Sequence, residues 1–357
     1  MNRNILWSLA LNTCGLGLLA GCNMNSGPLA EAAGTVPTPS PPVTTTPPPA
    51  PPAHIVQPSI FVSQYGQEPI SVLGFAGTPS GPNPLYVEVP GWLPAVDAAG
   101  NLYVVSCYLG VENGCTPDIN VYPPDAIVPG KPARSLHTHL AHILDMKVSK
   151  TGVIFVSDGK GVAVFSVTSN GDDAPVRYIV PSFKPGLIAV DDSDNLYGES
   201  VDPSGALVGP VLGVAVFGPK DTGQVAPSRM IAGPSTPFDR SFGYSAMATD
   251  SQGNLYVAGS RPRKDGLYPY GVYEFGPSAD GDASSFRYIT TPGMDDGSYE
   301  GTGVAVDSAG NIYVSAALSL NVAAVFVFPR DASGSVIPIS VIASPAFRVN
   351  AGGIALY

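Results

Sequence analysis

Three of the four histidines of the chain lie within one short segment, at His137, His139 and His142. If this segment is a strand, alternate positions share a face, and His137 and His139 point the same way. A third imidazole nearby could then complete a zinc site, because imidazole is a common zinc ligand. The simpler interpretation, which we adopt, is that these are exposed loop histidines without a ligand. Zinc binding stays the alternative.

Acidic residues form two further candidate sites. Glu300 opens a Glu-Gly-Thr-Gly segment before an apolar run; one carboxylate there could bind a metal, but the sequence identifies no partner ligands for it. The run Asp191-Asp-Ser-Asp194 resembles the start of a calcium loop, but it lacks the glycine and glutamate that complete such a loop. We therefore assign no catalytic residue and no cofactor. A divalent metal such as calcium or zinc is the alternative.

The cysteines point to a structural role. Cys107 ends an apolar run and Cys115 follows in the next loop, so in an oxidising compartment the two would form a disulfide. No histidine sits beside an obvious serine or cysteine nucleophile. The sequence also has no G-x-S-x-G motif, phosphate-binding loop or dinucleotide fingerprint. Nothing in it therefore indicates nucleophilic or nucleotide-dependent chemistry.

A basic and aromatic segment interrupts an otherwise acidic chain. Residues 261–270 contain three cations, Arg261, Arg263 and Lys264, and end with Tyr268 and Tyr270. Arginine and tyrosine are enriched at the energetic centres of interfaces, and loops on a rigid scaffold often carry binding. This segment is therefore the candidate binding loop. The alternative is a solvated insertion without a partner.

Composition restricts the elements that position these residues. Glycine and proline make up 79 of the 357 residues and only 13% are charged, which excludes helical bundles and coiled coils. Because 44% of the residues are hydrophobic, the chain can bury a core, which argues against full disorder. A formal net charge of -11 repels a phosphate backbone. We expect a turn-rich β protein with no nucleic-acid partner.

The N-terminal segment predicts export and lipid anchoring. Residues 1–21 combine one basic residue with an apolar run, as in a secretory signal peptide. They end in Leu-Ala-Gly before Cys22. This resembles the bacterial lipobox and implies acylation of Cys22, with palmitate or a similar chain, and membrane anchoring; the alternative is an ordinary signal peptide with a chance cysteine. Residues 22–57, rich in proline and threonine, predict a disordered tether. The expected location is the cell envelope, in the outer membrane or at the cell surface.

One pattern recurs through residues 58–357. Its clearest copy is Gly303-Val-Ala-Val-Asp-Ser-Ala-Gly-Asn-Ile-Tyr-Val314. Each copy predicts two short strands joined by a tight turn. The position of Asp307 is filled in the other copies by Asp97, Ser149, Asp191 and Asp250. These aspartates could ring a cation, but they recur with the turn itself, so we interpret them as turn caps.

A second pattern follows each copy of the first. It combines a strand such as Val162-Ala-Val-Phe165 with a later Pro-x-Arg-x-Ile strand, as in Pro175-Val-Arg-Tyr-Ile179. Four antiparallel strands in about 50 residues are typical of a β-propeller blade. Five such units fit between Trp92 and Ile342, three strands precede them, and Ile354–Tyr357 supplies the missing first strand. We therefore predict an all-β, six-bladed propeller whose two chain ends share one blade.

These repeats resemble NHL-type six-bladed β-propellers. They resemble more closely the NHL-like repeat proteins that are common among secreted bacterial proteins. The resemblance covers about residues 59–357 and implies an architecture rather than a reaction. Propellers of this kind bind proteins, glycans or small molecules, or act as metal-dependent lactonases and lyases with ligands from several blades. Because the sequence shows no such ligand set, we expect a monomeric, non-enzymatic scaffold for a protein or glycan. The alternatives are a metal-dependent lactonase or lyase, and a purely structural envelope protein.

Overall fold

The structure is a computed structural model that describes residues 60–64, 71–75, 86–106, 117–124, 132–201, 211–239, 241–319, 322–343 and 351–357. The chain divides into two units, Met1–Ala53 and His54–Tyr357, and all described residues belong to the second. The signal peptide, Cys22, the tether and the Cys107–Cys115 pair lie outside the described residues. Within these residues the regular elements are β-strands, and none forms a helix with the length and hydropathy to cross a membrane.

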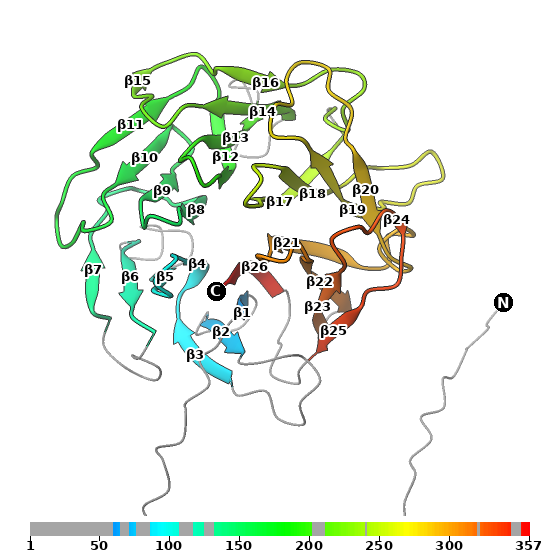
Figure 1. Ribbon diagram of the computed structural model, residues 1–357, viewed down its shortest axis with the longest axis horizontal. Coiled ribbons are helices and arrows are strands. Elements are labelled where there is room, and N and C mark those ends of the chain that lie inside the picture. Colours follow the sequence, from blue (N-terminus) through cyan, green and yellow to red (C-terminus); the bar gives the residue numbers. More distant parts are fainter. Residues whose placement is uncertain are drawn as a thin grey trace, which may run out of the picture. The chain divides into compact units, whose positions relative to one another are not determined.

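Five sheets, numbered here 1 to 5, consist of strands in chain order, with the first strand innermost and the last at the rim (Figure 1). Sheet 1 contains β4 (Trp92–Val96), β5 (Leu102–Val105), β6 (Ile119–Tyr122) and β7 (Arg134–Leu136). Sheet 2 contains β8 (Asp145–Val148), β9 (Ile154–Ser157), β10 (Val162–Phe165) and β11 (Arg177–Val180). Sheet 3 contains β12 (Lys184–Val190), β13 (Leu196–Val201), β14 (Val211–Phe217) and β16 (Arg229–Ile231). Sheet 4 contains β17 (Gly243–Thr249), β18 (Leu255–Ser260), β19 (Tyr270–Phe275) and β20 (Arg287–Thr290). Sheet 5 contains β21 (Glu300–Val306), β22 (Ile312–Ser319), β23 (Val322–Phe328) and β25 (Ser340–Ala343).

A further sheet, the shared sheet, joins both ends of the propeller unit. Its strand order is β26 (Ala351–Leu356), β1 (Ile60–Gln64), β2 (Ser71–Phe75) and β3 (Tyr86–Pro90), with β26 innermost. β1 and β26 are antiparallel, with Val62 opposite Ile354. This pairing removes the free edge that β1 would otherwise present. The predicted all-β propeller class and its closure by strands from both ends are confirmed.

Each of the four regular first hairpins is held by its aspartate, as Asp97 of sheet 1 illustrates. This residue is 6% exposed. Its Oδ1 accepts the backbone N–H groups of Ala99 and Asn101 at 3.0 and 2.9 Å. Its Oδ2 accepts the side-chain amide of Asn101 at 2.8 Å and the hydroxyl of Tyr103 at 3.0 Å. Four donors occupy the lone pairs of the carboxylate, which confirms turn capping. The same four bonds recur at Asp191, Asp250 and Asp307.

The first hairpin of sheet 3 departs from the others at one position. Asp194 stands where the equivalent turn of sheet 4 has Gly253, and its φ of 61° is in the left-handed region. Its Oδ1 is buried without a hydrogen-bond partner among the described residues. We expect Asp194→Gly to raise the free energy of unfolding, measured in urea, by about 1 kcal/mol, because it removes backbone strain and an unpaired oxygen. The reverse change, Gly253→Asp, should destabilise the protein. A destabilised Asp194→Gly variant would contradict this account.

A repeated contact, the rim lock, joins neighbouring sheets at their outer strands. The arginine of the Pro-x-Arg-x-Ile pattern donates to backbone carbonyls of the next sheet. The pairs are Arg134 with Ser169, Arg177 with Asp221, Arg229 with Pro277 and Ala279, and Arg287 with Arg330 and Ala332. Two residues later each outer strand pairs in parallel with a glycine of that next sheet. These pairs are Leu136 with Gly171, Ile179 with Gly223, Ile231 with Gly281, and Ile289 with Gly334. Two of these glycines begin the short strands β15 (Gly223–Gln224) and β24 (Gly334–Ser335).

Alternating strand direction divides the connections between two faces. The hairpins between first and second strands, and the loops between third and fourth strands, lie on what we call the turn face. The connections between second and third strands, and those between successive sheets, lie on the loop face. β1 is the second strand of the shared sheet and begins at Ile60, opposite Leu356. The chain therefore enters the propeller from the turn face.

Candidate functional site

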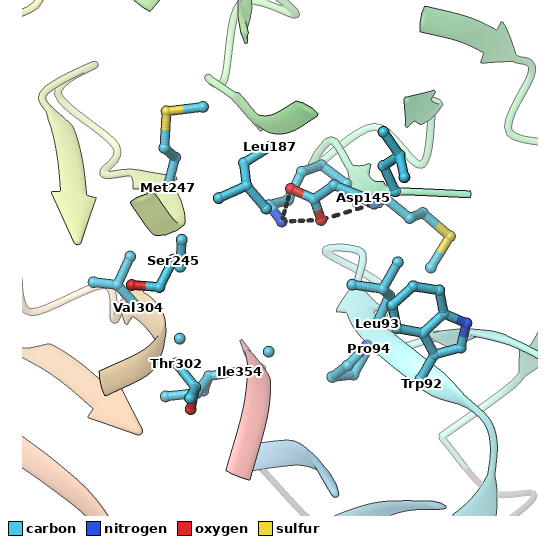
Figure 2. Close-up of a pocket in the computed structure, with 16 residues that line it drawn as sticks. Trp92, Leu93, Pro94, Asp145, Leu187, Ser245, Met247, Thr302, Val304 and Ile354 are labelled. Carbon is cyan, nitrogen blue, oxygen red and sulfur yellow. Dashed lines mark hydrogen bonds and ion pairs between the residues drawn. The ribbon is translucent and has the colours of Figure 1, made fainter. Parts of the chain in front are cut away.

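The centre of the propeller contains a small cavity. Its volume is about 100 Å³, below the roughly 300–1,000 Å³ of typical small-molecule sites. Apolar residues from different strands contribute to its lining (Figure 2). One from each innermost strand is Leu93 of β4, Met146 of β8, Leu187 of β12, Met247 of β17, Val304 of β21 and Ile354 of β26. Polar side chains, among them Asp145 and Ser245, share the lining, and the volume suits a few water molecules better than a metabolite.

One ion pair lies in the cavity wall. Asp145 is 2% exposed, and Lys147 Nζ lies 2.8 Å from its Oδ1. The same oxygen accepts the N–H of Met146 at 2.8 Å. The other oxygen accepts the N–H of Ile188, in β12, at 2.9 Å. The carboxylate thus joins β8 to β12, and its bonds are those of a structural group.

A second carboxylate, Glu199 of β13, supports the same part of β12. Its Oε2 accepts the N–H of Leu187 at 3.0 Å. Gly186 makes room for it, since a Cβ there would lie 2.5 Å from that oxygen. Burial, together with the nearby charge of Asp145, raises the pKa of Glu199 to about 6 against the opposing effect of its backbone hydrogen bond. The buried hydroxyl of Tyr244 has no hydrogen-bond partner among the described residues. Its pKa is raised by burial and then by the charge of Glu199.

Glu199 makes stability depend on pH. Because its pKa rises from 4.5 to about 6 on folding, the folded state binds the proton more tightly. That contribution is fully present below pH 4.5 and is lost as the pH rises through about 6. We compare the free energy of unfolding of Glu199→Gln with that of wild type, measured by urea denaturation at each pH. We expect the difference to shift in favour of the variant by roughly 2 kcal/mol between about pH 4 and about pH 7. A difference between the two proteins that stays constant over this range would contradict the buried-carboxylate account.

The hydroxyl groups in the cavity wall bond to other protein groups. Ser245 donates to the hydroxyl of Tyr270 at 3.0 Å, and Thr302 pairs with Ser315 at 3.1 Å. Ser245 and Thr302 stand at β-bulges of β17 and β21, where the pairing register shifts. Among the described residues, no histidine or cysteine lines the cavity. The wall therefore shows no nucleophile paired with a base.

The structure does not gather the predicted metal candidates. β7 ends at Leu136, before the histidines, so the expectation that His137 and His139 share a strand face was wrong. His137 Nδ1 lies 2.9 Å from Asp118, His139 Nε2 lies 2.9 Å from Asp172, and His142 is half-buried in the same connection. Glu300 begins β21, opposite Ala317, and its side chain lies outside the described residues. Within the described part of the chain, no three His, Cys, Asp or Glu side chains form a metal-binding group.

The basic and aromatic segment forms a hydrogen-bonded projection on the loop face, which we call the finger (residues 261–269). Arg261 N–H donates to the carbonyl of Pro269 at 3.2 Å, and Arg263 N–H donates to that of Leu267 at 2.8 Å. The side chains of Arg261 and Arg263 pair with Asp239 and Asp265 at 2.5 and 2.6 Å. Aspartates thus neutralise much of the predicted basic patch.

The exposed residues of the finger are apolar and aromatic as well as charged. Leu267 is 38% exposed and Tyr268 is 62% exposed, and Lys264 is exposed beside them. Tyr270 is different: it starts β19, is 2% exposed and belongs to the core. The expectation that Tyr270 contributes to the binding surface is therefore corrected. Besides the ion-paired residues, the finger exposes Leu267, Tyr268 and Lys264.

Comparisons with known proteins show the fold alone. No protein-family model matches the chain, and no curated protein matches it. A solved protein proposed to be TolB, from Agrobacterium tumefaciens, is 10% identical with a TM-score of 0.51, over 84% of this chain and 98% of that one. A protein of unknown function from Bacteroides caccae is 9% identical with a TM-score of 0.49, over 84% and 98%. A luciferin-regenerating enzyme is 15% identical with a TM-score of 0.47, over 74% and 78%. The first of these supports the β-propeller, and none carries an activity to this chain.

Sequence reasoning missed the two buried carboxylates. Asp145 and Lys147 flank Met146, at the start of the least regular copy of the repeat, and this irregularity was the available signal. Glu199 follows a regular copy and precedes a long loop, so its sequence context does not distinguish it from a loop residue. Its hydrogen bond to Leu187 depends on the β-bulge at Gly186 in the neighbouring strand β12. A single sequence does not show that bulge.

Proposed function

We propose that this protein is a non-enzymatic binding module of a bacterial cell envelope, whose loop face engages a protein or a glycan. The observation that carries the proposal is the finger, which holds Leu267 and Tyr268 exposed on a hydrogen-bonded support. Exposed aromatic side chains on a fixed backbone provide contact area at low entropic cost. The cavity is small, and the polar side chains of its wall already bond to other protein groups, which supports binding at the surface rather than chemistry in the channel.

The site of chain entry fits display of the loop face. The chain enters at Ile60 from the turn face, and the finger lies on the opposite side. The first described strand of the propeller thus begins on the face opposite the finger. We further propose that a lipid anchor at Cys22, followed by a tether of residues 22–57, holds the protein as a monomer in the outer membrane or at the cell surface.

Replacing Cys22 tests the anchor. We expect Cys22→Ala, made in the full-length chain, to move the protein from the membrane fraction to the soluble exported fraction, because the thiol to be acylated is gone. Fractionation with an antibody against the propeller measures this. Cys14→Ala, which changes a cysteine inside the predicted signal peptide, is the control and should stay with the membrane. Membrane association of Cys22→Ala equal to wild type would rule out the lipid anchor.

Metal analysis tests the non-enzymatic assignment against a metal-dependent lactonase or lyase. We expect purified full-length protein, after dialysis, to hold far less than one equivalent of calcium or zinc. One equivalent of metal that is lost in Glu300→Gln or in His137→Gln would overturn the proposal. The matched control is Glu274→Gln, which changes a buried carboxylate paired with Arg287 at the rim.

A further inference from the structure

The rim lock is present at four junctions between neighbouring sheets. In sheets 1 to 4 the outer strand supplies an arginine, and in each case its guanidinium reaches backbone carbonyls of the following sheet. The arginine also stacks near an aromatic ring of its own sheet in three cases, with Arg229 lying 6.0 Å from the ring centroid of Tyr197. Hydrogen bonds from a charged donor are worth more than neutral ones, so these contacts stabilise each junction.

Among the described residues, other side chains occupy the position of this arginine at the two junctions made by the shared sheet. The strand register identifies the equivalent positions, because Arg229 lies opposite Val216 one residue before the end of β14. In sheet 5 the same place, opposite Val327 of β23, holds Ser340. In the shared sheet, opposite Gly74 of β2, it holds Val87. Neither serine nor valine can make the multiple hydrogen bonds of a guanidinium.

We propose that the shared sheet is the opening segment of the ring and that it separates from sheets 1 and 5 while the other junctions stay closed. Its strands also differ from the rest in chain connectivity, since β26 and β1 are joined only by pairing. Apolar packing is present at both of its junctions, where Val62 shares a core cluster with Val325 and Val72 shares one with Val104. Without the charged hydrogen bonds of the rim lock, we expect these junctions to open at a lower free energy than the four that have it. Gly353 and Ile354 of β26 line the central cavity. Opening at this sheet therefore gives small solutes a lateral route into the cavity.

Hydrogen exchange of the full-length protein, followed by mass spectrometry, tests this inference. We expect amides of β1, β2 and β26 to exchange at least tenfold faster than those of β13, β14, β18 and β22, under conditions where opening is at equilibrium. Equal exchange rates in all six sheets would overturn the proposal. Faster exchange in sheets 2 to 4 than in the shared sheet would overturn it as well.

A second test removes the rim-lock arginine from another junction. Arg229→Ser gives the junction between sheets 3 and 4 the residue that sheet 5 has at the equivalent position. We expect amides of β14 and β16 to exchange about tenfold faster in this variant, with the shared sheet unchanged. No change in β14 and β16 would show that the arginine does not set the strength of the junction. Arg229→Lys keeps the charge without the guanidinium and should give a smaller change, which provides a milder test if the serine variant folds poorly.

Discussion

Replacing Asp97 with alanine is expected to lower the free energy of unfolding by about 3 kcal/mol, because it leaves one buried and three partly buried donors without their acceptor. The lost partners are the amides of Ala99 and Asn101, the side chain of Asn101 and the hydroxyl of Tyr103. Burial, with a further contribution from Asp97, raises the pKa of Tyr103 to about 12, so that hydroxyl is a donor at every relevant pH. Urea denaturation measures the change.

The effect of Asp97→Ala should extend beyond its own turn. The hydroxyl of Tyr103 also accepts from Arg134, 3.2 Å away, and Arg134 makes the rim lock to Ser169. The matched control is Ser149→Ala, at the same position of sheet 2, where the serine hydroxyl accepts the N–H of Val153 at 3.3 Å and pairs with the hydroxyl of Thr151 at 2.8 Å. We expect Ser149→Ala to lower the free energy of unfolding by less than about 1 kcal/mol. Similar losses in the two variants would contradict the role given to the aspartate.

Deleting residues 351–357 is expected to abolish cooperative folding of the propeller. The deletion removes β26, which exposes the inner edge of β1 and takes away the part of the cavity wall formed by Gly353 and Ile354. An unpaired strand edge in an open ring also favours aggregation. Far-UV circular dichroism during thermal unfolding, together with gel filtration, measures the result.

Removing Tyr357 alone is the control for this deletion. Its ring is 60% exposed and rests near Gly100 and Pro124, outside the paired part of β26. We expect this variant to unfold cooperatively with a loss below about 1 kcal/mol. A monomer without residues 351–357 that melts cooperatively near the wild-type temperature would show that closure does not depend on β26.

The architecture was predictable because most copies of the repeat use the same bonds. The aspartate caps the turn, the tyrosine reaches back to that aspartate, and the arginine at the rim bonds to the next sheet. A residue type needed for the same contact in each copy leaves a periodic pattern in the sequence. The shared sheet was predictable from the same pattern, because Ile354–Tyr357 matches only the first strand of a repeat and residues 60–89 match only the other three.

The details of the site were less predictable because they depend on contacts between distant segments. The histidine segment reads as a strand, but His137 N–H bonds to the carbonyl of Gly171 in the next sheet and the strand stops at Leu136. The local sequence predicts a free charge at Arg261, but its guanidinium pairs with Asp239, which is 22 residues away in the chain. These partners come from loops whose relative positions are set by the ring and not by the local sequence.

Photo-crosslinking from the finger tests the central claim most directly. A photoreactive phenylalanine analogue at position 268, in full-length protein made in cells, should give one discrete adduct that protease or glycosidase treatment then assigns to a protein or a glycan. The same analogue at Phe286, which is 66% exposed at the turn-face end of β20, is the control and should give none. The account predicts an adduct from position 268 alone. No adduct from position 268, or equal adducts from both positions, would contradict binding through the loop face.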